Sequence, residues 1–251
     1  MATLAALAGM VVWIGVKEGS PRNQDDAHEN LKDILIKGFS ATRKNPRLSI
    51  AGVGYFVSRG DLLVMTTFFS LWIVAVGVDS GMETGAAQSY AGRMFGISQL
   101  ALLIFFPIMG FLVDRFDRVT TLAISLGTAA AGYFALYIVG NPFESPFIIL
   151  VAIMAGAGEA AVIVSCPALV GQEAPGKFRG AIIGLMGACG ILGVLIHAKI
   201  CGVLFDAISY QTPFLYMAGI NAITGLIAVI VRIKTGTSAD VAARMERAAN
   251  G

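Results

Sequence analysis

Long apolar runs, separated by short polar connections, dominate the pattern of the chain. A membrane-spanning helix needs about 20 predominantly apolar residues. Six stretches meet this requirement, namely residues 55–78, 93–113, 119–139, 147–170, 180–204 and 213–231. They are longer than the alternating segments of about 10 residues that build membrane barrels. The pattern therefore predicts an all-α membrane protein with a six-helix transmembrane bundle over residues 51–234.

A shorter apolar run opens the chain at residues 2–16. Its length is below the roughly 20 residues of a full span. A signal peptide is the alternative, but no basic residue precedes the run and no small-residue cleavage site is evident. We therefore interpret residues 1–16 as a truncated transmembrane helix.

Residues 17–50 form the one long polar segment, which we interpret as a linker. It contains apolar residues at nearly helical spacing, and an acidic pair at residues 25–26 is suited to cap such a helix. The spaced apolar residues are Leu31, Ile34, Leu35 and Phe39. Basic residues accompany them, so we expect an amphipathic helix at the membrane interface. Pro46 is expected to begin the next helix.

Lysine and arginine are distributed unequally when the six helices are laid out in alternating directions. One side receives the 17–50 segment, the turns near residues 114–118 and 171–179, and a tail at residues 235–251. The connections on the other side carry acids but no Lys or Arg. Because basic loops stay in the cytoplasm, we expect a cytoplasmic C-terminus in a multi-pass protein of a plasma or bacterial inner membrane.

Composition supports this class and excludes others. Of the 251 residues, 56% are hydrophobic and only 14% are charged, whereas soluble domains carry about 25% charged residues. The net charge of +2 gives no reason to expect a nucleic-acid partner. The three cysteines lie in apolar runs and are interpreted as small buried hydrophobes. We predict no metal or other cofactor.

The turn after the second predicted helix carries a short motif. It combines Gly110, Asp114, Arg115 and Arg118 in the order Gly-x-x-x-Asp-Arg-x-x-Arg. This turn resembles the loop signature of the major facilitator superfamily, Gly-x-x-x-Asp-Arg-x-Gly-Arg-Arg/Lys, although Asp117 replaces the usual second glycine. The region from Gln172 through the glycine-rich helix to Pro213 resembles the tenth to twelfth helices of the same family.

The resemblance implies that the chain is the C-terminal half of a twelve-helix secondary transporter. Its six spans would be helices seven to twelve, and residues 1–16 the remnant of helix six. A missing N-terminal six-helix half would be its partner, and a small solute would bind between the halves near the membrane midplane and cross by alternating access.

The resemblance also assigns a cytoplasmic gate. Asp114 would face a helix end of the absent half, and Arg115 or Arg118 would pair with Glu173. A plain topogenic turn is the alternative, because basic residues in short loops orient any membrane protein. To this gate we add Arg59 and Asp61, expected near the cytoplasmic end of helix 55–78. The full set is Gly110, Asp114, Arg115, Arg118, Glu173, Arg179, Arg59 and Asp61.

Four ionisable residues within the spans are candidates for proton coupling or for the substrate cavity. Glu159 carries the most information because it lies midway along helix 147–170, where an ionised carboxylate costs at least about 2.5 kcal/mol. The others lie nearer outer helix ends: His197, Lys199 and Arg93. A structural, hydrogen-bonded role is the alternative for Glu159.

Two other function classes are alternatives to transport. A membrane enzyme is disfavoured, because the sequence has neither a Gly-x-Ser-x-Gly nor a His-Glu-x-x-His motif. A non-transporting scaffold or sensor with the same fold stays open, because a fold does not determine a function.

Overall fold

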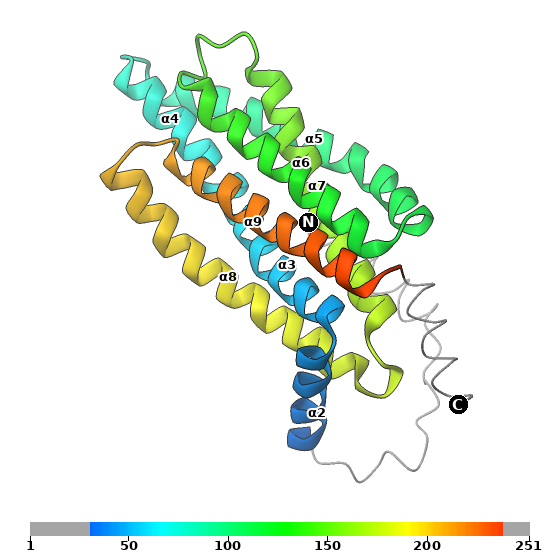
Figure 1. The fold of residues 1–251 in the computed structure, drawn as a ribbon. Coiled ribbons are helices and arrows are strands. Elements are labelled where there is room, and N and C mark those ends of the chain that lie inside the picture. Colours follow the sequence, from blue (N-terminus) through cyan, green and yellow to red (C-terminus); the bar gives the residue numbers. More distant parts are fainter. Residues whose placement is uncertain (1–30, 238–251) are drawn as a thin grey trace, which may run out of the picture. The chain divides into compact units, whose positions relative to one another are not determined.

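The computed structural model describes residues 31–237, and the helices within this range follow the predicted apolar runs. The predicted helix at residues 1–16, the acidic pair at 25–26 and residues 238–251 lie outside the described residues. The elements are α2 (Leu31–Lys44), α3 (Pro46–Leu63), a π-helical turn (Val64–Phe68), α4 (Phe69–Asp79), α5 (Thr84–Arg115), α6 (Arg118–Val139), α7 (Ile148–Glu173), a 3-10 turn (Gly176–Phe178), α8 (Arg179–Ala207) and α9 (Thr212–Thr235) (Figure 1).

Six of these helical stretches are long and apolar enough to cross a membrane, which confirms the predicted count for the described part of the chain. The first begins at Pro46, as expected from the sequence, and runs to Asp79, so it starts before the apolar run at residues 55–78. Asn45 caps this helix by accepting a hydrogen bond from the backbone N–H of Arg47, and Pro46 is pre-set for a first helical position. Residues 46–54 therefore extend the helix at the N-terminal end of the apolar run.

The span also contains one wide turn. The π-helical turn Val64–Phe68 inserts an extra residue into an otherwise α-helical backbone. The hydroxyl of Thr66 donates to the carbonyl oxygen of Leu62 at 2.7 Å, one turn earlier. The turn separates α3 from α4, and the buried side chains of both segments still enter one core.

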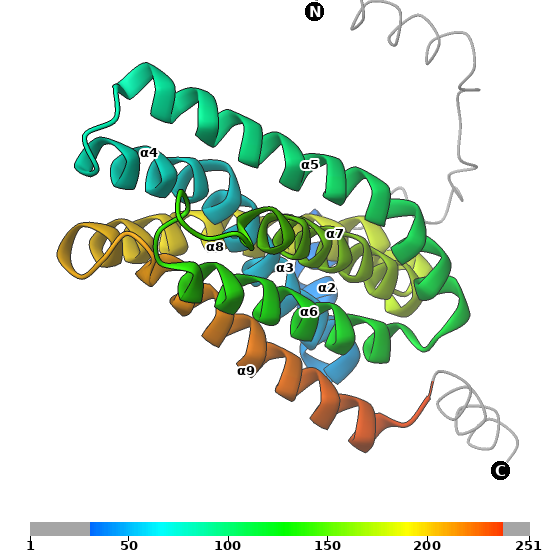
Figure 2. The ribbon, with the colours of Figure 1, turned by 90° about the horizontal axis from the view of Figure 1, so that it is seen from above.

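Small residues allow α7 to pack between α5 and α6 (Figure 2). A Cβ on Gly156 would collide with the carbonyl oxygen of Ser98 on α5, and one on Gly158 would lie 2.6 Å from Cα of Ala129 on α6. Because only glycine fits at these two positions, the backbones approach closely on both sides of α7. This helix is the most deeply buried of the spans.

The glycine-rich helix α8 packs against α3. A Cβ on Gly193 would collide with the carbonyl oxygen of Phe56, and one on Gly190 would lie 2.8 Å from Cγ of Arg59. The two earlier members of the series, Gly184 and Gly187, have no atom within 4 Å of a Cβ. Of these four glycines, only Gly190 and Gly193 therefore lie against α3.

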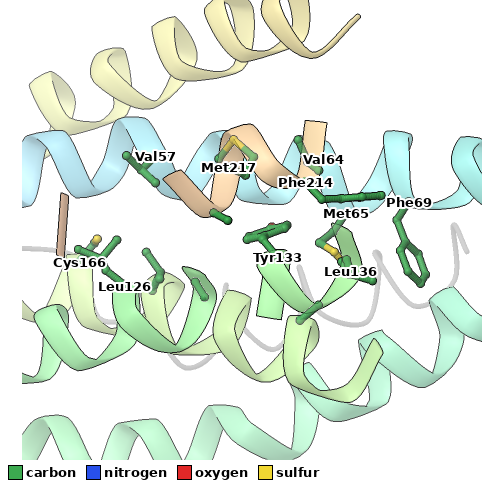
Figure 3. Packing of buried hydrophobic residues seen from close by; sticks show 14 of the residues in the cluster. Val57, Val64, Met65, Phe69, Leu126, Tyr133, Leu136, Cys166, Phe214 and Met217 are labelled. Atoms are coloured by element: carbon green, nitrogen blue, oxygen red, sulfur yellow. The ribbon is translucent and has the colours of Figure 1, made fainter. Parts of the chain in front are cut away.

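The core is formed by buried residues of α3, α4, α6, α7 and α9, with smaller contributions from α5 and α8, and Figure 3 shows part of it. Trp72 on α4 is fully buried, with its ring centroid 5.2 Å from that of Phe214 on α9 in an edge-on arrangement. Tyr133 of α6 is buried among apolar residues of α3 and α9. Of the cysteines, Cys166 and Cys201 are buried thiols and Cys189 is half-buried.

Candidate functional site

A polar layer crosses the middle of the bundle. Asn221 of α9 donates from Nδ2 to Oδ1 of Asp61 on α3 at 2.7 Å, and Tyr133 of α6 donates to the backbone carbonyl of Asp61 at 3.0 Å. Both the Asp61 and the Asn221 side chains are buried. Asp61 Oδ2 has no hydrogen-bond partner among the described residues. One acidic residue therefore joins three helices while keeping one carboxyl oxygen unused.

We predicted that Asp61 belongs to the gate, near one end of the span. Asp61 follows Arg47 by 14 residues along α3, which is about 21 Å at 1.5 Å per residue. Since the hydrocarbon core is about 30 Å thick, the residue lies well inside the membrane span. The gate prediction counted Asp61 from the start of the apolar run at residue 55, whereas the helix begins at Pro46.

Glu159 lies at the same depth on α7. It precedes Glu173 by 14 residues, again about 21 Å, and Glu173 forms an ion pair with Arg47. Its side chain is fully buried, and neither carboxyl oxygen has a hydrogen-bond partner of good geometry among residues 31–237. Asp61 and the amide of Gln99 on α5 are close enough to interact with it electrostatically. Two acids therefore share one membrane level without a described cationic partner.

His197 is also buried at this level, beside Asp61 in space rather than at an outer helix end. Its ring lies against Gly60, where any Cβ would collide with it, and its Nδ1 is 2.9 Å from the hydroxyl of Tyr216. The ring centroid of Phe56 is 4.7 Å away. A histidine on α8 is thus fixed by one glycine and two aromatic residues.

Lys199 and Arg93 do not join this layer. Both side chains are exposed, and the guanidinium of Arg93 lies 5.7 Å from the ring centroid of Tyr90 on its own helix. Among the four predicted intramembrane candidates, the structure therefore brings only Glu159 and His197 into the buried interior.

A charged network ties four helices together at one end of the bundle, which we call the basic end. Arg47 forms ion pairs of 2.7 Å with both Asp117 and Glu173, and Arg232 lies 3.2 Å from Asp117. Asn45 donates to the second oxygen of Glu173. The network connects the starts of α3 and α6 to the ends of α7 and α9.

Asp117 explains why the signature departs from the family pattern. It caps α6 by accepting from the backbone N–H groups of Val119 and Thr120, and it also pairs with Arg47 and Arg232. The usual glycine could do neither. Sequence reasoning missed this function, although Asp before a helical run is a known capping signal.

The other gate candidates occupy different surroundings. Glu173 pairs with Arg47 rather than with Arg115 or Arg118. Arg118 instead donates a hydrogen bond to the carbonyl of Ala168 on α7. The guanidinium of Arg115 lies 5.9 Å from the ring centroid of Phe111.

An open cleft of about 490 Å³ adjoins this network. Asp114 lines it together with Gln172, Arg118 and Asp117. A Cβ added to Gly110 would have no atom within 4 Å, so no described helix approaches this glycine closely. Arg179, the first residue of α8, is exposed.

These features define a class: a polytopic helical membrane protein with buried acids at mid-depth and an ionic network at one end. The sequence model of the Major Facilitator Superfamily matches residues 60–249. The chain therefore belongs to the Major Facilitator Superfamily, a family of membrane transporters rather than enzymes.

Several characterised proteins resemble the chain. Magnetosome protein MamZ of Paramagnetospirillum magneticum is 30% identical over 78% of this chain and 30% of its own length. The multi-drug resistance efflux pump PmrA of Streptococcus pneumoniae is 23% identical over 72% of the chain and 44% of its own length. The class E tetracycline resistance protein of Escherichia coli is 27% identical over 61% and 36%. The chain thus spans less than half the length of these relatives.

Proposed function

We propose that this six-helix bundle forms one half of a secondary active transporter and pairs with a second, N-terminal six-helix bundle. A small solute would bind between the two and cross the membrane by alternating access. Membership of the family supports this proposal, as does the similarity to proteins named as efflux pumps and resistance proteins. In such folds the substrate site lies at the interface of the repeats near the midplane.

We further propose that transport is coupled to protons through Glu159. The observation that carries this proposal is a fully buried carboxyl group, without a described hydrogen-bond partner of good geometry, about 21 Å along α7 from the ion pair at Glu173. An ionised carboxylate in this place lacks a counter-charge, so the arrangement fits a carboxylic acid that holds a proton in this state. Release of the proton would require the site to open to water.

The experiment compares Glu159→Gln with the wild type in the complete gene product, reconstituted in proteoliposomes. We expect the variant to insert normally and to lose pH-gradient-driven movement of the solute, while exchange of the solute without a gradient persists. Glu83→Gln serves as the matched control, since Glu83 is exposed at the start of α5. Wild-type gradient-driven transport by Glu159→Gln would refute the coupling assignment.

The same experiment tests the alternative of a scaffold or sensor. That alternative predicts no solute flux for the wild type under any gradient, with the protein correctly inserted.

A further inference from the structure

The residue two positions before the buried Asp61 is an arginine with the opposite exposure. Arg59 follows Arg47 by 12 residues on α3, which is about 18 Å deeper in the span. Neighbours two apart on a helix do not share a face. Asp61 accordingly points into the core, while Arg59 is exposed on the other side of α3. We predicted Arg59 in the gate, and in the structure it lies in the first half of the Pro46–Asp79 span.

Arg59 lacks an acidic partner in the described part of the chain. The ion pairs at the basic end use Asp117 and Glu173, and no ion pair within the described residues includes Arg59. A charged side chain at membrane depth faces a water-filled cavity or a counter-ion. An exposed arginine within the span, without a described acidic partner, is therefore suited to bind an anion.

A cavity of about 140 Å³ lies beside this guanidinium. Arg59 lines it together with two hydroxyl-bearing residues of α3, Tyr55 and Ser58. The opposite wall comes from α7 and includes Ile163 and Pro167. Since a water molecule occupies about 30 Å³ in the liquid, the cavity is large enough for a small charged group. The site thus offers one cation and two hydroxyl donors.

Two backbone features prepare the site. Pro167 lies inside α7 and has no N–H, so the carbonyl of Ile163 lacks its usual helical donor. On the other side, Gly190 of α8 leaves room for the stem of Arg59, since a Cβ there would lie 2.8 Å from Arg59 Cγ. The arginine is therefore packed in place before any ligand arrives.

We propose that Arg59 binds an oxyanion, a carboxylate or a phosphate, of the transported solute, with Tyr55 and Ser58 as supporting hydrogen-bond donors. A planar guanidinium matches either group through two parallel hydrogen bonds. This assignment rests on the proposed transport function and adds to it a solute class. It also gives two residues of one helical turn different functions, since Arg59 binds the anion whereas Asp61 remains in the core.

Binding is measured on the complete gene product in detergent, by thermal unfolding followed through tryptophan fluorescence. The probes are benzoate, succinate, inorganic phosphate and glycerol 3-phosphate, compared with glucose and tetraphenylphosphonium. We expect at least one oxyanion to raise the melting temperature in a saturable manner. Arg59→Gln should weaken its apparent Kd at least tenfold, Arg59→Lys should weaken it less, and Arg43→Gln on exposed α2 should leave it unchanged.

Three results would overturn the proposal: stabilisation by glucose or the phosphonium cation alone, no stabilisation by any of the four oxyanions, or an unchanged Kd in Arg59→Gln. If Arg59→Gln fails to fold, Tyr55→Phe is measured in its place. We expect this variant to weaken the apparent Kd for the oxyanion at least threefold. An unchanged Kd would count against the site. No proton gradient is present in this assay. A failure of proton coupling at Glu159 would therefore not change the measured oxyanion binding, so the two proposals can be refuted independently.

Discussion

Asn221 of α9 donates a hydrogen bond of 2.7 Å to the carboxyl group of Asp61 on α3, and both side chains are buried. The same amide also donates to the carbonyl of Met217 on its own helix at 3.0 Å. Both amide protons of Asn221 are thereby used, and its geometry is fixed by its own helix. The bond consequently positions the acid as well as connecting the two helices.

Replacing Asn221 with leucine should destabilise the bundle by about 1 kcal/mol, because interhelical hydrogen bonds in membranes average about 0.6 and reach about 1.7 kcal/mol. Unfolding in mixed detergent micelles measures the change. A double-mutant cycle with Asp61→Asn isolates the coupling between the two side chains. A coupling energy of zero would mean that the contact contributes nothing, and Ile223→Leu on the exposed face is the control.

Gly193→Ala should destabilise the protein by about 1–3 kcal/mol, since its new methyl group would collide with the backbone carbonyl of Phe56 and force α8 away from α3. Gly184→Ala and Gly187→Ala are matched controls on the same helix, with open space at the added methyl. Thermal unfolding of the three variants should show a lower melting temperature for Gly193→Ala only. Equal shifts for all three would contradict the close packing of α8 on α3.

Arg47→Ala should be the most damaging substitution at the basic end. It removes the partner that Asp117 and Glu173 share, and breaking a buried ion pair from one side destabilises a protein by about 3–5 kcal/mol. Arg43→Ala, four residues earlier and exposed, should change stability little. If the two variants unfold alike, the network does not stabilise the bundle. Arg47→Lys should recover only part of the loss, because an ammonium lacks the fork of a guanidinium.

The basic end should face the cytoplasm, because Arg47, Arg118 and Arg232 all lie there and basic loops are retained on that side. A C-terminal fluorescent-protein fusion should therefore fluoresce in a bacterial host, and a C-terminal alkaline phosphatase fusion should be inactive. The reverse pattern would invert the topology. A fusion of each reporter after Asn141, in the connection between α6 and α7, provides the opposite expectation.

Apolar length was sufficient to predict all six spans in the described chain, because the hydrocarbon thickness sets a minimum that loops do not reach. Glu159 could be recognised as a buried acid for the same reason. Pro46 was correctly expected to begin the first helix, whereas the apolar run began only at residue 55, because Arg47 and Ser49 precede it. Counter-charges from α6 and α7 accompany Arg47, and such tertiary partners do not follow from local sequence.

The burial of His197 also could not be predicted from the local sequence. Its depth could be counted along its own helix, but its burial depends on the missing side chain of Gly60 on α3. Nothing local to either helix links these two positions. The sequence could likewise suggest that Asn221 joins helices, although it could not identify Asp61 as its partner.

The π-helical turn at Val64–Phe68 changes the rotational register of the first span, so the side chains after the inserted residue are rotated about the helix axis relative to those before it. Deleting a single residue there would leave the hydropathy profile nearly unchanged, yet it would rotate α4 by about 100° relative to α3, since a helix turns once per 3.6 residues. Trp72 would then leave its edge-on contact with Phe214. Alignments of related chains that place a one-residue gap elsewhere in this span would consequently compare core positions of one protein with lipid-facing positions of another.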